Sequence, residues 1–328
     1  MTVRTTYPFL VLVAGLVLAA VWSLATGPLS WQEVDATVAG LRLERLAAGL
    51  LAGAALAVSG TLMQGLFRNP LASPSVTGVT AGASLGALIM LLLWDSAPAA
   101  WAAAIPRTLW LPVGAFAGAL AALATLQIVA RRRGDLASVL LVGMVLAILF
   151  GAIAGFVLAT GADRYGVGRA MLAFSLGSLD NASPAEISLT LPLVVIGIGF
   201  AWTWGRPLDL ALSGETEAAS LGLDVPQLRR WVLVWTAVLA ASAVVLGGGI
   251  GFVCLVVPNA LRLWLGPHHR PLVIGSALGG ALFLTLADTC ARRLAPVGGE
   301  VPLGVVTGLV GAPFFLWCFR RERAAGRM

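Results

Sequence analysis

The chain has 328 residues, of which 59% are hydrophobic and 11% are charged, and its mean hydropathy is +0.94. Soluble globular proteins carry about 25% charged residues, so this composition excludes an ordinary soluble domain and indicates an integral membrane protein. All 21 basic residues are arginine. A chain without lysine can be neither a P-loop ATPase nor a Schiff-base enzyme. The net charge of +6 is spread between apolar segments, which favours a role in membrane topology over nucleic-acid binding.

Ten apolar segments of roughly helix-spanning length recur along the chain. The alternating pattern of a membrane β-barrel is absent from the sequence. We therefore predict an all-α integral membrane protein of about ten transmembrane helices, forming one domain over residues 1–328. Residues 1–27 resemble a signal peptide, but their apolar run is too long, and we expect an uncleaved first span. The segments are 8–26, 44–66, 77–94, 109–130, 137–160, 187–205, 229–247, 251–265, 271–291 and 303–320.

The eighth segment, 251–265, is short and follows Gly247, Gly248 and Gly249. It either is broken or does not cross the membrane fully.

The arginine distribution predicts the orientation. If both termini are cytoplasmic, most arginines fall in inside loops and in the two tails, as the positive-inside rule requires. The arginines of this inner set are Arg4, Arg68, Arg131, Arg132, Arg133, Arg206, Arg229, Arg230, Arg262, Arg270, Arg320, Arg321, Arg323 and Arg327.

A smaller group of arginines stays on the outer side, against this bias. Arg42 and Arg45 begin the second span, and Arg292 ends the ninth, where it stands four residues after Asp288 and can pair with it on one helix face. Two interpretations remain open for these arginines: a docking surface for an acidic partner, or snorkelling of side chains at helix ends.

Residues 206–230 are polar and lie between two apolar segments. Good helix formers and the helix-stopping Gly222 predict a short helix over about 213–222, outside the membrane. Such a helix suits a handle for another protein, and a solvated connecting loop is the alternative. The loop 159–186, the longest on the outer side, is expected to be either a short gating helix over a transport route or a plain connector.

The sequence shows no catalytic constellation or metal-ligand spacing. We expect His268 and His269 to lie in a solvated loop, and Cys254, Cys290 and Cys318 to pack as small apolar residues. Carboxylates are almost missing from the spans, which argues against an ion-coupled secondary carrier without excluding it. No nucleophile–base pair is visible, so an enzyme is not expected.

Residues 42–86 contain an ordered string of short motifs, with R-x-x-R followed by G-A-x-L-x-x-S-G, a glutamine and R-N-P-L-A-x-P. The string resembles the FecCD-type permeases, the type II ABC importer subunits that carry iron-siderophore complexes, haem and vitamin B12. The resemblance extends over about residues 30–320. Its motif residues are Gln64, Arg68, Asn69, Pro70, Gly251, Pro258, Asp288, Pro302 and Pro313, together with the segment Gly214, Glu215, Glu217, Ala218, Leu221 and Gly222.

The resemblance implies a permease homodimer in the bacterial inner membrane, two cytoplasmic ATP-binding subunits that use ATP and Mg²⁺, and a periplasmic substrate-binding protein. It implies no cofactor or metal on this chain. Arg42, Arg45 and Arg292 would meet acidic residues of the binding protein, and 214–222 would be the helix that couples to the ATPase. The implied cargo is an iron chelate, either siderophore or haem, with cobalamin as the alternative.

Three positions depart from the family pattern. Glu44 replaces the usual proline of R-x-P-R, Cys254 replaces a glycine, and Asn259 replaces the histidine after Pro258. These departures leave the cargo and the local gate geometry open.

Overall fold

The computed structural model describes residues 3–27, 35–94, 107–133, 136–161, 167–180, 182–294 and 301–324. All regular structure within these ranges is helical, as predicted. The helices are α1 (Val3–Ala25), α2 (Ala36–Phe67), α3 (Val79–Trp94), α5 (Arg107–Arg133), α6 (Leu136–Gly161), α7 (Val167–Leu176), α8 (Pro184–Thr203), α9 (Gly205–Ala211), α10 (Glu215–Ser220), α11 (Val225–Gly247), α12 (Val253–Leu265), α13 (His269–Leu294) and α14 (Leu303–Ala324).

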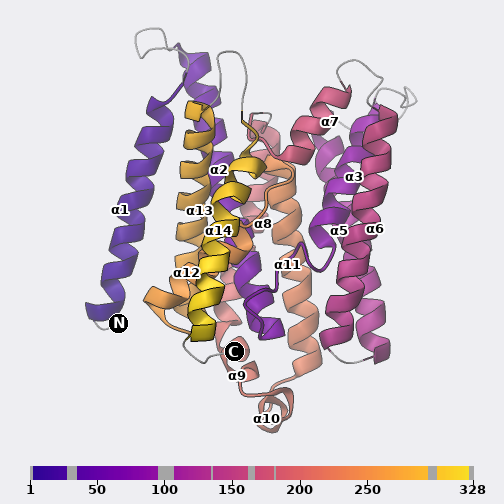
Figure 1. The fold of residues 1–328 in the computed structure, drawn as a ribbon, viewed down its shortest axis with the longest axis vertical. Helices are drawn as coiled ribbons and strands as arrows, with labels where there is room; N and C mark the ends of the chain where they lie inside the picture. The colour runs from indigo at the N-terminus through magenta and orange to yellow at the C-terminus, as the bar shows by residue number, and fades with distance from the viewer. Residues whose placement is uncertain are drawn as a thin grey trace.

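In the described part of the chain, seven helices are long and apolar enough to cross a membrane: α1, α2, α5, α6, α8, α11 and α13. Three shorter apolar helices, α3, α12 and α14, complete the set. Together they correspond to the ten predicted segments. The long helices run side by side, and α10 projects beyond the bundle at one end while α7 lies at the other (Figure 1). Both chain ends lie at the α10 end (Figure 1).

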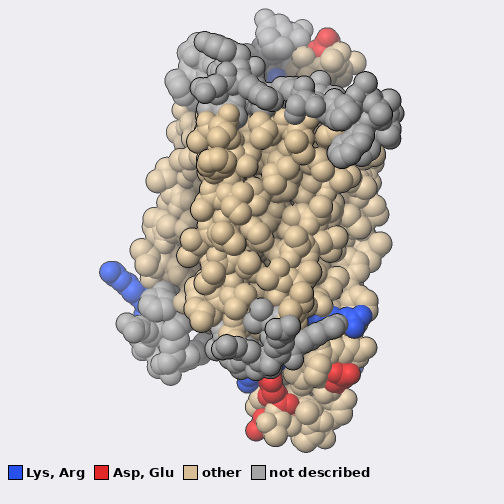
Figure 2. Space-filling model, turned by 90° about the vertical axis from the view of Figure 1, so that its right-hand side faces the viewer, with Lys and Arg blue, Asp and Glu red and all other residues tan. Residues whose placement is uncertain are grey.

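The surface agrees with a membrane location. One face shows a broad band without charged side chains, with basic and acidic residues near its two edges (Figure 2). The exposed residues of α6 are mostly large and apolar, among them Ile148 and Phe156, which are 73% and 69% exposed. Exposing such a surface to water is unfavourable, whereas contact with lipid or with another apolar surface stabilises it.

Helix α2 is the centre of the bundle and packs against α13, α11, α12 and α8. It begins eight residues before the predicted segment, because the Asp35 carboxylate accepts the backbone N–H of Val38 and caps an earlier first turn. Close contact with α13 depends on small residues. A Cβ at either Gly53 or Gly280 would collide with the backbone carbonyl of the other glycine.

The glycines at 247–249 interrupt the helical structure between α11 and α12, which is one of the two predicted alternatives. Helix α11 ends at Gly247, and Gly248 adopts φ 63°, a conformation that favours glycine. Helix α12 has only 13 residues, so its length of about 20 Å is less than the hydrocarbon thickness of a bilayer. It therefore does not cross the membrane as a helix by itself.

Candidate functional site

The first candidate region is the projecting segment α9–α10. Gly214 precedes α10 with φ 132°, and Gly222 follows it with φ 86°, so a glycine stands at each end of the helix. Only Ala218 of α10 is buried, whereas Leu221 just after it is 67% exposed. The predicted helix over about 213–222 is thus present, and it offers most of its surface to the outside.

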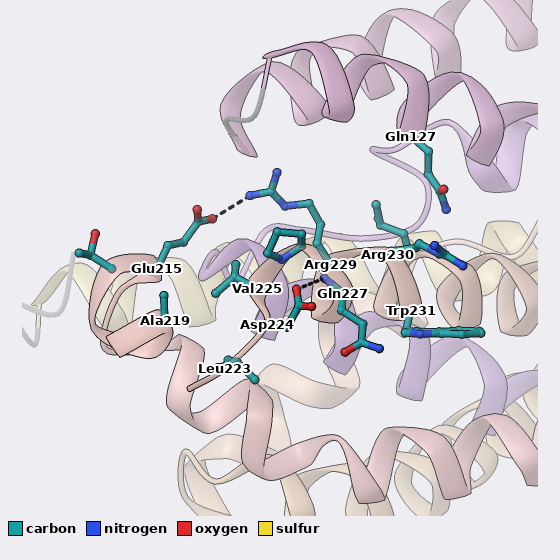
Figure 3. A pocket seen from close by; sticks show the side chains of 13 residues that line it. Gln127, Glu215, Ala219, Leu223, Asp224, Val225, Gln227, Arg229, Arg230 and Trp231 are labelled. Atoms are coloured by element: carbon teal, nitrogen blue, oxygen red, sulfur yellow. Dashed lines mark hydrogen bonds and ion pairs between the residues drawn. The ribbon is translucent and has the colours of Figure 1, made fainter. Parts of the chain in front are cut away.

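An ion pair ties α10 to the base of α11. The Nη2 atom of Arg229 lies 2.9 Å from Oε1 of Glu215, with the guanidinium 12% and the carboxylate 43% exposed. Beside this pair lies a cleft of about 990 Å³ between α10, α11 and the end of α5 (Figure 3). Its charged and polar lining residues are Gln127, Glu215, Thr216, Asp224, Gln227, Arg229 and Arg230.

Helix α9 is joined to the first turn of α13. The Asp209 carboxylate accepts the backbone N–H of His269 at 2.9 Å, and it lies 2.6 Å from Nδ1 of the same residue. Burial opposes ionisation of Asp209, but the hydrogen bonds from His269 outweigh it and lower the pKa of this carboxyl below its ordinary value.

The expectation that both histidines lie in a solvated loop is wrong for His269. The His269 side chain is 1% exposed, whereas that of His268 is 76% exposed. Adjacent residues at a helix start point in different directions, and only His269 faces the bundle. In the described residues, no group of three His, Cys, Asp or Glu side chains could hold a metal ion.

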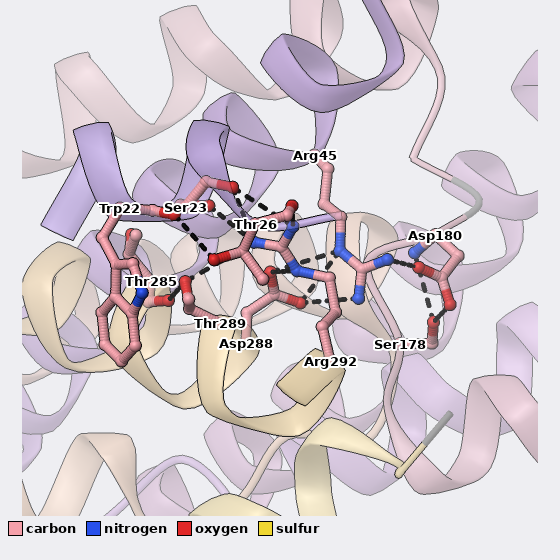
Figure 4. A network of polar contacts seen from close by, with 10 residues as sticks. All are labelled: Trp22, Ser23, Thr26, Arg45, Ser178, Asp180, Thr285, Asp288, Thr289 and Arg292. Carbon is pink, nitrogen blue, oxygen red and sulfur yellow. Dashed lines mark hydrogen bonds and ion pairs between the residues drawn. The ribbon is translucent and has the colours of Figure 1, made fainter. Parts of the chain in front are cut away.

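The second candidate region is a network of arginines and carboxylates at the opposite end (Figure 4). Asp288 on α13, with 5% of its side chain exposed, lies 2.8 Å from Arg45 Nη2 and 3.1 Å from Arg292 Nε. The predicted Asp288–Arg292 pair is therefore confirmed. Arg45 also pairs with Asp180, which follows α7 and is more exposed than Asp288.

Arginines at this end of the bundle also bind the C-terminal end of α1. Arg292 donates to the Thr26 carbonyl at 2.6 Å and to Ser23 Oγ at 2.8 Å, and Arg42 donates to the Leu24 carbonyl at 2.9 Å. The three arginines expected to dock a partner thus lie together at one end of the bundle, where each also contacts the chain itself. The carboxylate Asp180 was missed in the sequence, because nothing in its local pattern connects it with Arg45.

The segment around α7 meets the glycine break. The N–H of Ser178 donates to the Gly247 carbonyl at 3.1 Å, Gly249 donates to the Phe174 carbonyl at 3.0 Å, and Leu303 donates to the Gly177 carbonyl at 2.9 Å. The predicted loop 159–186 therefore contains a helix, α7, and its gating role stays a prediction. Residues 162–166 and 181 of that loop lie outside the described residues.

The family-motif residues at the end of α2 form a turn that side chains from other parts of the chain stabilise. Arg68 ends α2 in the left-handed conformation, with φ 48°. The Gln64 side chain donates to the Cys254 carbonyl at 3.3 Å, and Asn69 accepts the N–H of Leu71. Asn259 donates to the Pro70 carbonyl at 3.0 Å. The departure at 259 therefore supplies a donor that holds this turn.

The other motif residues lie around the ends of α12 and within α14. Gly251 is exposed and precedes α12, and Pro258 is buried within it. The Pro302 carbonyl accepts the N–H groups of Val305 and Val306 in the first turn of α14, and Pro313 lies exposed in the same helix.

Comparison with known proteins shows the family of this chain. The model of the FecCD transport family matches residues 5–321. The chain belongs to the FecCD transport family. It is 38% identical to a hemin transport system permease protein HmuU of Yersinia pestis, over 92% of this chain and 87% of that protein.

Two further relatives are named for a different cargo. A vitamin B12 import system permease protein BtuC of Vibrio cholerae is 40% identical, over 92% of this chain and 85% of that one. A cobalamin import system permease protein BtuC of Halobacterium salinarum is 38% identical, over 88% and 74%. A solved metal-chelate type ABC transporter in an inward-facing conformation superposes with a TM-score of 0.84 at 27% identity, covering 95% of this chain and 97% of that one. The chain is accordingly a permease of the ABC importer type.

Proposed function

We propose that this FecCD permease forms a homodimer in a bacterial inner membrane and carries an iron chelate, siderophore or haem, from a periplasmic binding protein to the cytoplasm. Two separate ATP-binding subunits, with ATP and Mg²⁺, supply the energy. Both termini are cytoplasmic in this proposal, on the same side as α10. Cobalamin is the competing cargo, because relatives of similar identity are named for it.

The observation that carries the proposal is the pairing of two specialised ends. At one end, α10 projects from the bundle with Leu221 67% exposed, although a leucine outside the membrane gains from being covered. This surface supports docking of an ATPase subunit. At the other end, Arg45 and Arg292 share the Asp288 carboxylate while Arg42 binds the end of α1, and bidentate arginine–carboxylate pairs suit the orientation of an acidic binding protein.

The test is transport by the purified permease in liposomes, reconstituted with the ATPase and the periplasmic binding protein of the same import system. We expect uptake of haem or a ferric siderophore that requires ATP, Mg²⁺ and all three components. Uptake of cobalamin alone would correct the cargo. Uptake by this chain by itself, driven by an ion gradient, would contradict the proposal and favour a secondary carrier.

A further inference from the structure

The Asp209–His269 contact joins two helices that are far apart in sequence, α9 and α13. Asp209 belongs to α9, which leads into α10, and it binds the backbone and the ring of His269 at the start of α13. The carboxylate therefore caps a helix 60 residues away in the chain, where the helix N-terminus favours negative charge. A residue of the projecting segment thus binds directly to a spanning helix.

The imidazole of His269 also rests against α2. A Cβ at Gly65, near the end of α2, would collide with the Nε2 edge of the ring. The ring is 1% exposed, and within the described residues Nε2 has no hydrogen-bond partner. One side of His269 is consequently bound to α9, and the other packs against α2 without a polar contact.

The next residue strengthens the junction. The Arg270 guanidinium lies 4.6 Å from the ring centroid of Trp202 at the end of α8, a cation–π contact. A Cβ at Gly205, where α9 begins, would lie 2.9 Å from Arg270 Cγ and 3.0 Å from its backbone nitrogen. The first turn of α13 therefore fits tightly against the corner between α8 and α9.

Helices α13 and α2, which meet at His269, both extend to the arginine network at the opposite end of the bundle. Helix α13 has 26 residues, about 39 Å of straight helix, and it carries Asp288 and Arg292 in its last turns. Helix α2 carries Arg45 and packs along α13 through Gly53 and Gly280. A displacement of α9 that is transferred to α13 would consequently reach the network.

We propose that the Asp209–His269 contact is the joint through which movement of α9–α10 is passed to α13 and α2. His269 is a positioning residue for transport: it binds no cargo, and it holds the projecting segment to the spans. The inference rests on the proposed function, because it presumes that a partner moves α10. Beyond the proposed function, it names the contact that passes this movement to the membrane-spanning helices. The coupling between the two states of the permease then depends on the Asp209–His269 contact.

The test separates coupling from stability by measuring ATP hydrolysis and uptake in the same proteoliposomes, with the ATPase and binding protein present. His269→Ala removes the ring but keeps the backbone N–H that Asp209 caps. We expect it to lower the uptake per ATP hydrolysed at least about fivefold, the lower end of typical allosteric coupling, while ATP hydrolysis continues. Ile274→Ala, at an exposed position of the same helix, is the matched control and should keep the wild-type ratio.

Two further variants keep the test decisive if His269→Ala folds poorly. The amide nitrogen of His269→Asn lies near the position of Nδ1 and can still donate to Asp209, whereas that of His269→Gln lies near Nε2 and cannot. We expect coupled transport with Asn and loss of coupling with Gln. Equal uptake per ATP in these two variants, or a wild-type ratio in a folded His269→Ala, would overturn the inference. A wild-type permease that needs no ATPase would instead refute the proposed function.

Discussion

Arg45 on α2 and Asp288 on α13 form a part-buried ion pair, with 2.8 Å between Nη2 and the carboxylate, although the two residues are 243 positions apart in the chain. Arg292 shares the same carboxylate, so one buried negative charge holds two guanidinium groups. Such a pair is a weak contributor to net stability, but removing one partner leaves uncompensated charge. This asymmetry makes Asp288 the most sensitive position of the network.

Asp288→Asn should therefore destabilise the protein strongly. The variant removes the carboxylate that Arg45 and Arg292 share and leaves their two positive charges close together, and breaking a buried pair typically costs about 3–5 kcal/mol. Thermal unfolding in detergent measures the effect. Glu217→Gln, at an exposed position of α10, is the control and should change the midpoint little. A wild-type midpoint for Asp288→Asn would show that the arginines do not depend on this carboxylate.

Glu215→Arg should abolish uptake while the protein still inserts into the membrane. The substitution places two arginines where Glu215 and Arg229 now pair, and it reverses the charge at the start of α10. Uptake in cells, with membrane-fraction immunoblots, measures both properties. The double variant with Arg229→Glu restores the pair in reverse. If uptake returns, the pair matters for local structure; if it stays lost, the carboxylate itself faces the ATPase. Normal uptake in the single variant would refute a role in coupling.

Much of the architecture could be predicted because bilayer physics is local. Ten apolar stretches, the stop at Gly222 and the glycine break after α11 are each visible in short windows of sequence. Likewise, the Asp288–Arg292 pair follows from helical spacing alone. The helix α10 was predicted from its composition, although composition could not choose between a handle and a connecting loop.

The contacts between distant segments could not be predicted in this way. The Asp180–Arg45 and Asp209–His269 pairs join residues that no periodic pattern relates. The burial of His269 did leave a signal: His269, Leu272, Val273 and Ser276 recur at helical spacing and are all buried. The helix-breaking Pro267 and the polar His268 next to it concealed this signal, because they make the same stretch resemble a loop.

Gly53→Ala should destabilise the α2–α13 contact. Its Cβ would enter the space of the Gly280 carbonyl, and forcing extra carbon into a well-packed contact typically costs about 1–3 kcal/mol. Gly40→Ala is the matched control in the same helix, because a Cβ there meets nothing within 4 Å. That variant should be neutral or stabilised by up to about 1 kcal/mol through helix propensity. Equal midpoints of the two variants in thermal unfolding would contradict the close approach.

The lowered pKa of Asp209 predicts that the stability of the protein depends on pH. Its pKa is lowered in the folded protein, so its ionised form contributes stability above the ordinary value of 3.8, and this contribution is lost as the pH falls through the folded value. His268 and His269 are the titratable groups that face it. Asp209→Asn should unfold at a lower temperature than wild type near pH 7, with the difference shrinking below about pH 4. A difference that stays constant down to pH 3 would mean that the carboxylate charge contributes nothing.

Asp180→Asn should strengthen binding of the periplasmic binding protein. Asp180 is the more exposed of the two carboxylates on Arg45, and an incoming acidic residue would have to compete with it for the same guanidinium. An exposed pair is worth about 0.2–1 kcal/mol, so Kd should fall by up to about fivefold, and less at high salt. Asp35→Asn is the matched control, because it removes a charge near the start of α2 while an asparagine still caps that helix. Surface plasmon resonance on nanodisc-embedded permease measures both variants, and a Kd that rises for Asp180→Asn would show that Asp180 assists docking instead of competing with it.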